Sequence, residues 1–283
     1  MSTVSVNTVD KNSGSTLTIG GAGTTVNIAG TAGTGFPSTT INNNADNRVI
    51  TGSGTSGTLN GESGLIFDGS KLGIGATPTL ALDISSTDPR IYMIDTTNAG
   101  STYKTKFGQY NDTFLISTND GANDAIKIYA TGEVSKPLQP TFLVNVSSDS
   151  VHPNLPTGVT IIDFGSEAYD VGNNVSSVGV FTAPVTGKYQ FNTSMAFADI
   201  TTSTTLLEVF IKASNREMRG CLQNVANLQA GDYQSFGFST MVDMDASDTC
   251  FVQVAITGGG GTIDVISGST SAPLSFFSGT LIC

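Results

Sequence analysis

The sequence has few charged residues, no tryptophan and a single histidine. Charged residues make up 12% of the 283 positions, which is about half of the usual share. Residues that favour helices are scarce, and we find no amphipathic helical pattern longer than about two turns. Short apolar alternations separated by Gly, Asn, Asp and Ser recur along the chain, and this pattern is typical of strands and turns. The sequence therefore predicts an all-β protein.

Positive charge is also scarce. Lys and Arg number 12 against 23 Asp and Glu, so the formal net charge is −11. A surface that binds nucleic acid needs a basic stripe, and none is present. No run of apolar residues approaches the roughly eighteen needed for a membrane span, and the N-terminus lacks the pattern of a secretory signal. We therefore expect a soluble chain with neither nucleic acid nor a membrane as a partner.

The three cysteines are widely spaced, at Cys221, Cys250 and Cys283, and form no C-x-x-C pair. An odd number at such spacing argues against a disulfide framework. We expect three free thiols that behave as small apolar side chains. The alternative is one disulfide bond between Cys221 and Cys250.

Residues 1–35 contain two related pieces, Thr16–Gly21 and Thr25–Gly30, which are offset by nine positions. Each piece places apolar residues two apart, as a short strand with one apolar edge would. So few aliphatic side chains cannot offset the conformational entropy of this glycine-rich segment. We predict an N-terminal anchor that packs against partner chains, with a disordered tail as the alternative. The predicted anchor residues are Leu17, Ile19, Val26 and Ile28.

Two further segments precede the C-terminal half. Residues 36–80 carry short apolar pairs between glycine-rich turns, and we predict a shaft built by several chains. Residues 81–135 change to longer period-two alternations, which predict a small β-sandwich. Its predicted inner positions are Leu82, Ile84, Ile91, Met93, Phe114, Ile116, Ile126 and Ile128.

Residues 136–283 predict a head domain of ten short strands between Thr141 and Ile282. Regularly spaced short strands of this kind suit a two-sheet jelly roll. Aromatic residues are concentrated here and supply the largest buried area. The residues predicted to pack in the core or at a trimer interface are Phe181, Tyr189, Phe191, Phe236, Phe238, Phe251, Phe276, Phe277 and Leu281.

Two resemblances follow from particular motifs. The run Val178–Asn192, with its turn Phe181–Pro184, and the closing run Phe277–Leu281 resemble the globular head of complement component one, subcomponent q, and tumour necrosis factor-like jelly rolls. That resemblance implies a jelly roll that assembles as a homotrimer. The piece Ala45–Gly75 resembles the connecting segments of phage tail-fibre and other virion fibre proteins. Residues 81–134 are similar to the domain that often precedes the tip of such fibres.

The residues that could support catalysis or metal binding are isolated in the sequence. His152 lies beside Pro153 without a nucleophile motif, so we expect a surface loop histidine and not a general base. Asp243, Asp245 and Asp248 alternate in a way that could hold calcium, but they lack the glycine and the closing glutamate of a calcium loop. A solvated turn is the preferred interpretation. We therefore predict no catalytic site, metal or cofactor.

The leading hypothesis for function is a structural component of a tailed-phage virion, assembled in the host cytoplasm. In this hypothesis a trimeric fibre or spike docks to other virion proteins by its N-terminus and presents the head to a host cell-surface glycan or protein. A capsid head fibre or decoration protein is the nearest alternative. From other classes, we also considered a polysaccharide depolymerase and a secreted complement-like recognition protein.

Overall fold

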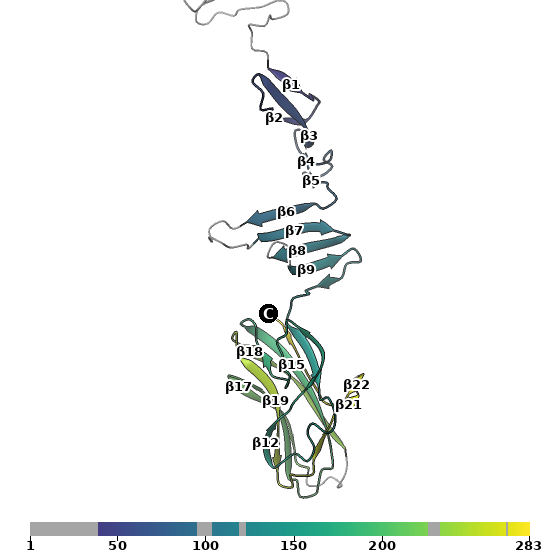
Figure 1. The fold of residues 1–283 in the computed structure, drawn as a ribbon, viewed down its shortest axis with the longest axis vertical. Helices are drawn as coiled ribbons and strands as arrows, with labels where there is room; N and C mark the ends of the chain where they lie inside the picture. Colours follow the sequence, from purple (N-terminus) through teal and green to yellow (C-terminus); the bar gives the residue numbers. More distant parts are fainter. Residues whose placement is uncertain (1–38, 95–103, 119–122, 226–232, 270) are drawn as a thin grey trace, which may run out of the picture. The chain divides into compact units, whose positions relative to one another are not determined.

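The computed structural model describes residues 39–94, 104–118, 123–225, 233–269 and 271–283. Every regular element in these ranges is a strand, β1 to β23 in Figure 1, so the all-β class is confirmed. Within the described ranges, no helix could serve as a membrane span. The predicted anchor residues Leu17, Ile19, Val26 and Ile28 lie outside these ranges. The chain divides into two units between Thr87 and Asp88.

The first unit contains one small sheet. Its strands are β1 (Thr40–Asn42), β2 (Arg48–Gly52), β3 (Thr58–Phe67), β4 (Leu72–Ile74) and β5 (Leu82–Ile84). The order is β1-β3-β4-β5, with β2 also paired to β3. Strand β5 corrects our prediction, because Leu82 and Ile84 belong to this sheet and not to the following domain. They pair in parallel with Leu72 and Ile74, whose apolar spacing they repeat.

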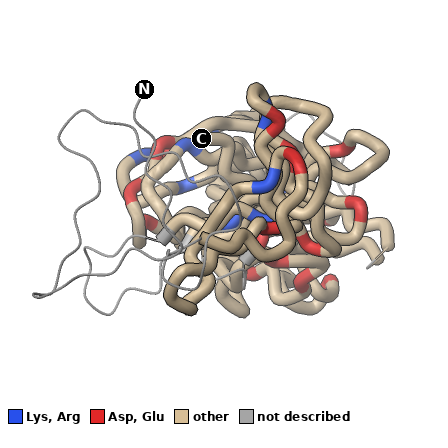
Figure 2. Tube along the Cα trace, turned by 90° about the horizontal axis from the view of Figure 1, so that it is seen from above, with Lys and Arg blue, Asp and Glu red and all other residues tan. Residues whose placement is uncertain are grey.

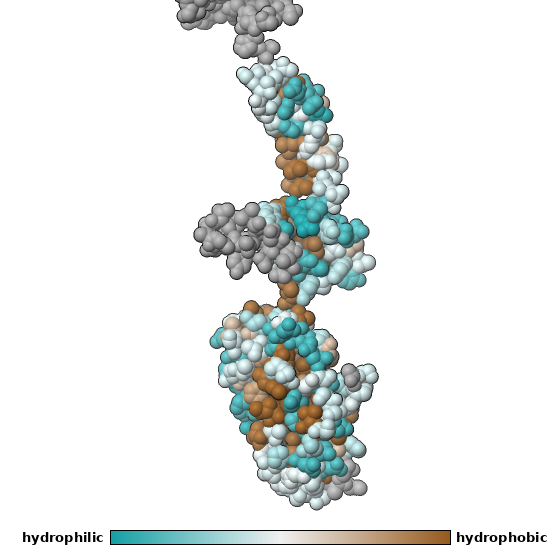
Figure 3. Space-filling model, in the orientation of Figure 1, coloured by the Kyte–Doolittle hydropathy of each residue, from teal (hydrophilic) through white to brown (hydrophobic). Residues whose placement is uncertain are grey.

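This small sheet leaves apolar side chains open to solvent. Phe67, Ile74, Leu80 and Leu82 are all exposed, and Figure 3 shows hydrophobic surface over β4 and β5. A sheet of such short strands has too little core to be stable alone. The prediction that several chains build the shaft gives these side chains a way to be buried.

The second unit begins with an antiparallel sheet. Its strands are β6 (Arg90–Ile94), β7 (Lys104–Tyr110), β8 (Thr113–Thr118), β9 (Asn123–Tyr129) and β10 (Val134–Ser135). Sequential strands are neighbours, in the order β10-β9-β8-β7-β6. We predicted a small sandwich here, but the described residues of this segment form one sheet without a second layer. Period-two alternation identifies an apolar face and does not say what covers it.

The head contains two larger sheets. The first head sheet consists of β11 (Thr141–Asn145), β13 (Ser166–Val171), β15 (Gly187–Ala198), β18 (Gln234–Met244), β20 (Asp264–Ile266) and β23 (Phe276–Leu281). The second head sheet consists of β12 (Gly158–Ile161), β14 (Phe181–Thr182), β16 (Leu206–Ala213), β17 (Arg216–Gln223) and β19 (Thr249–Thr257). A short hairpin is formed by β21 (Gly268–Ser269) and β22 (Ala272–Pro273).

The connections between these sheets are those of a jelly roll. The first head sheet has the order β13-β11-β23-β15-β18 and the second has β12-β19-β16-β17. From β11 to β16, successive strands alternate between the two sheets, and the last strand returns beside the first. This is the arrangement that double-sheet jelly rolls use. All ten predicted strands are present, and β13, β21 and β22 were not predicted, the first because its sequence mixes charged and apolar residues without alternation.

An aromatic cluster fills the space between the two head sheets. Phe181 extends from β14 into this cluster. Its ring centroid lies 5.3 Å from that of Tyr189 and 5.6 Å from that of Phe191. Phe142 lies 5.1 Å from both Phe181 and Phe277. Aromatic pairs at such distances stabilise a core beyond their buried area. The Tyr189 hydroxyl donates a hydrogen bond of 2.7 Å to the Val185 carbonyl, which satisfies its polar end, and burial raises its pKa.

The predicted core residues divide into three groups. Phe181, Tyr189, Phe191 and Phe277 are buried, whereas Phe236, Phe238 and Leu281 are partly buried and pack against the core. Phe251 and Phe276 lie on the outward faces of β19 and β23, so a place in the core is wrong for both, and packing at a trimer interface stays a prediction. Their neighbours Cys250, Val252 and Phe277 take the inward positions, and side chains alternate along a strand.

Candidate functional site: an uncharged face of the head

The outer face of the first head sheet carries no charged residue along the middle of its central strands, and its Lys188 on β15 and Asp243 on β18 lie at one end. Inward positions belong to the aromatic core, so the alternate residues of β11, β23, β15 and β18 point away from it. We call the part of this set that lies beyond Lys188 and Asp243 the uncharged face. Its members are Thr141, Leu143, Gln190, Asn192, Ser194, Ser239, Met241, Phe276, Ser278 and Thr280.

The strand register places Ser278 at the centre of the uncharged face. Ser278 lies opposite Leu143 on one side and Asn192 on the other, and Asn192 lies opposite Ser239. The Asn192 amide donates to the Ser278 hydroxyl at 3.3 Å. The Gln190 amide likewise donates to the Ser239 hydroxyl at 3.2 Å. Because these polar groups bond to one another within the face, a partner can cover them at a low desolvation cost.

The outer face of the second head sheet is different. There Arg219 pairs with Glu208 at 3.1 Å and with Glu217 at 3.2 Å, and Lys212 pairs with Glu217 at 3.1 Å. The Arg219 guanidinium also lies 5.3 Å from the centre of the Phe210 ring. The central part of protein interfaces is depleted of charged residues. The uncharged face is therefore the better candidate for an interface, and the charged face suits contact with water.

Charges elsewhere in the described residues do not form a basic surface. Figure 2 shows Lys and Arg scattered among Asp and Glu along the trace, without one basic cluster. Neutralising many phosphates requires such a cluster. The expectation that nucleic acid is not a partner stays a prediction.

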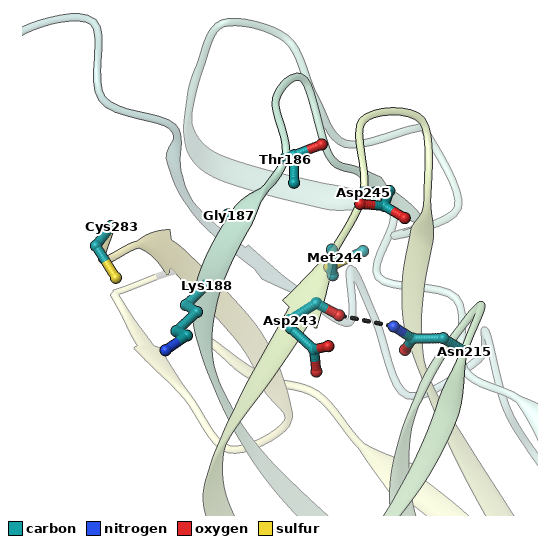
Figure 4. A pocket seen from close by; sticks show the side chains of 8 residues that line it. All are labelled: Thr186, Gly187, Lys188, Asn215, Asp243, Met244, Asp245 and Cys283. Atoms are coloured by element: carbon teal, nitrogen blue, oxygen red, sulfur yellow. Dashed lines mark hydrogen bonds between the residues drawn. The ribbon is translucent and has the colours of Figure 1, made fainter.

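A depression at one end of the head contains Asp243 and Asp245, which belong to the acidic segment considered for calcium binding. Asp243 pairs with Arg216 at 2.6 Å, and its carbonyl accepts a hydrogen bond from the Asn215 amide at 2.8 Å (Figure 4). The Asp248 carboxylate accepts the backbone N–H of Asp245 at 3.0 Å. Among the described residues, no three His, Cys, Asp or Glu side chains converge as metal ligands. Asp243 thus forms an ion pair, whereas Asp245 and Asp248 form a turn.

His152 is half-buried, which corrects its assignment as a surface loop residue. Its Nε2 accepts the backbone N–H of Asp163 at 2.7 Å, and its carbonyl accepts the N–H of Val265 at 3.1 Å. The imidazole therefore links its own loop to the loop at Asp163, with its acceptor nitrogen occupied, and the His152 backbone bonds to β20. Burial lowers the pKa of His152, with the Asp163 carboxylate opposing that shift.

This arrangement predicts a pH-dependent stability. The unfolded chain binds a proton near the ordinary histidine pKa of about 6.5, whereas the folded chain binds it only at lower pH. The free energy of unfolding should therefore fall as the pH drops below about 6.5. Urea unfolding of the head between pH 7.5 and pH 5 measures this. In His152→Gln, whose amide oxygen can accept the same hydrogen bond without titrating, stability should stay nearly constant over that range; an unchanged pH dependence would exclude His152 as its source.

The three cysteines are unpaired, so the alternative disulfide bond between Cys221 and Cys250 is wrong. Cys250 is buried in the core, and burial raises its pKa. Cys221 is partly buried, and Cys283 is exposed at the end of the chain. All three thiols follow the prediction of free side chains.

Sequence reasoning missed the uncharged face, although the sequence contains a signal for it. We searched for inward aromatic residues and left their outward neighbours aside. After Lys188 at the start of β15, those neighbours on β15 and β23 are Gln, Asn, Ser and Thr, with Phe276 among them. A solvent-facing strand usually includes charged residues. An uncharged set of outward positions on adjacent strands was therefore the available clue.

Comparison with known proteins gives matches among solved structures. No protein-family model matches the chain, and no curated protein does. The globular domain of the zebrafish complement 1qA protein is 13% identical, covers 51% of this chain and 98% of its own, and has a TM-score of 0.37. Murine APRIL is 14% identical over 51% and 99% of the two chains, with a TM-score of 0.35. The Eiger TNF of S. frugiperda is 13% identical over 51% and 94%, with a TM-score of 0.32. Complement and tumour necrosis factor domains, which the head motifs resemble, are thus among the structural matches.

Proposed function

We propose that this chain is a structural virion protein of a tailed bacteriophage. Three copies form a fibre or spike, the N-terminal segment docks to other virion proteins, and the head contacts a glycan or protein of the host surface. The observation that carries this proposal is that successive β modules of one chain each leave an apolar or uncharged surface open. The resemblance of Ala45–Gly75 to fibre connecting segments supports the assignment to a virion.

The uncharged face supports self-association of the head. Because it lacks charge, identical copies meet there without like-charge repulsion, and each removes Leu143 and Phe276 from water. The paired side chains Asn192 and Ser278 lose few hydrogen bonds with water when they are covered. The charged outer face of the second head sheet then remains in solvent. Three copies give each particle several weak contacts with a host surface, and their combined avidity greatly exceeds that of one contact.

The position of the protein in the particle separates the two virion hypotheses. We would label purified phage particles with an antibody raised against residues 136–283 and image them by electron microscopy. We expect the antibody to label the tail and to inhibit adsorption of the phage to its host. Labels on the capsid would instead favour a head fibre or decoration protein, and particles without any label would overturn the virion assignment.

The enzyme hypothesis has a direct test as well. In the described residues, the histidine that we considered as a general base has its Nε2 occupied by the backbone N–H of Asp163. Incubation of the full chain with purified capsular polysaccharide or lipopolysaccharide is expected to leave both intact. Release of oligosaccharides would identify a depolymerase.

A further inference from the structure

The sheet β6 to β10 has two faces of different character. Cross-strand partners lie on the same face of a sheet, and one row of partners runs Ile91, Phe107, Ile116, Ile126. We call this side the apolar face. Its residues, including two polar ones, are Ile91, Met93, Thr105, Phe107, Gln109, Phe114, Ile116, Ile126, Ile128 and Val134.

The opposite face of this sheet carries the charges. Arg90 lies over the Tyr110 ring and Lys106 over the Tyr92 ring, each 5.1 Å from the ring centre. Lys127 pairs with Asp124 at 3.1 Å. The described positions of the apolar face carry no charge. The sheet is therefore amphipathic, with one face suited to water and one suited to a hydrophobic core.

The apolar face is uncovered in a single chain. Val134 is 61% exposed, Met93 52% and Phe114 39%. Burying a large apolar side chain contributes about 1.5–3 kcal/mol, so an uncovered face forfeits much of the stability of the sheet. Antiparallel sheets normally pack one face on a core. Something must cover this face in the working form of the protein.

We infer that the apolar faces of three copies of this chain pack against one another around a common axis and form a shared core. The five strands hold 27 residues, and at about 3.4 Å per residue and about 4.8 Å between strands they present about 440 Å² of face. Three such faces together bury about 1,300 Å², which is within the range of specific protein interfaces. Ile116 lies on the central strand β8, between Phe107 and Ile126, and is placed nearest to the axis.

Two features select further copies of this chain as the occupant. The absence of charge makes the face complementary to itself. In addition, only residues 136–140 separate β10 from β11, and such a linker reaches less than about 20 Å. Copies that associate through their heads therefore hold their β6–β10 sheets close together, at a high effective concentration. This inference rests on the proposed self-association of the head.

The test places a single cysteine on each face of the sheet. The background is Cys221→Ser with Cys283→Ser, which removes the partly and fully exposed thiols and keeps the buried Cys250. Ile116→Cys lies on the apolar face, and Leu115→Cys, the adjacent residue, lies on the charged face opposite Lys127. Gln109→Cys is a second apolar-face variant, at an exposed position where no cavity results. After mild oxidation, we expect covalent dimers from Ile116→Cys or Gln109→Cys on a non-reducing gel, and none from Leu115→Cys.

Light scattering of the same samples distinguishes a failure of the shared β6–β10 core from a failure of head association. A trimeric mass without cross-links from either apolar-face variant would overturn the shared core and leave the association of the heads intact. Equal cross-linking from Leu115→Cys would also overturn it, because the contact would not select a face. A monomeric mass would overturn both the shared core and the proposed trimer.

Discussion

Ser278→Asp is expected to dissociate the assembled protein into single chains. Ser278 lies at the centre of the uncharged face, opposite Leu143 and Asn192, where no basic side chain is available as a partner. An uncompensated charge buried at an interface costs about 3–5 kcal/mol, which corresponds to a loss of association of about a hundredfold or more. Size-exclusion chromatography with light scattering at micromolar concentration measures the change in mass.

A matched substitution on the other sheet provides the control. Gln253→Asp introduces the same charge on the outer face of β19, beside the network of Arg219 and Glu208. That face is predicted to remain in water, so this variant should keep the mass of the unsubstituted protein. If Ser278→Asp keeps its mass while Gln253→Asp loses it, the interface has been assigned to the wrong sheet.

Gly279→Val is expected to unfold the head. A Cβ atom at Gly279 would lie 2.5 Å from Phe142 and 2.6 Å from Phe191, which is well inside van der Waals contact. Both rings are fixed by the aromatic cluster and by the strands on either side. Overpacking a core costs about 1–3 kcal/mol, and occasionally more, and we expect the upper end here. Because ordinary domains have only about 5–15 kcal/mol of stability, this is a large fraction.

Two further variants make this result interpretable. Gly279→Ala should lower the midpoint of urea unfolding less than Gly279→Val, since only one carbon is added. Thr257→Val, at an exposed position at the end of β19, places the same β-branched valine where it has the shape of the residue it replaces, and should change the free energy of unfolding by less than about 0.5 kcal/mol. An unchanged midpoint for Gly279→Val would show that the rings can move aside.

The jelly roll of the head could be predicted because its signals are local. The alternation around Tyr189 and Phe191 and the turn after Phe181 define strands within a few residues. The pattern predicts strands at Gly187–Ala198 and Thr249–Thr257, and these are the observed bounds of β15 and β19. The glycine in the closing motif also has a local reason, because only a residue without a side chain fits between Phe142 and Phe191 at Gly279.

Other features depend on contacts that the sequence does not specify. Phe276 and Phe277 are adjacent aromatic residues, and alternation alone cannot say which of them faces the core. The β6–β10 segment shows the same limit, since its apolar residues were assigned correctly to one face and wrongly to a sandwich of one chain. His152 was misplaced because its partner Asp163 is remote from it in a loop without periodicity. In each case the missing information is which segment covers a given face.

A charged substitution at Tyr189 would not be a test of assembly. Tyr189 is buried inside a single head, where it packs against Phe181 and Phe191. A charge there would unfold the head before it could report on the interface. Substitutions on the uncharged face, such as Ser278→Asp, separate assembly from folding.

The mass of the full chain in solution tests the central claim most directly. The account predicts that multi-angle light scattering at micromolar concentration gives about three times the 29.1 kDa of one chain, because the open surfaces of the chain are covered by its own copies. A mass of 29.1 kDa, with the chain folded, would contradict it.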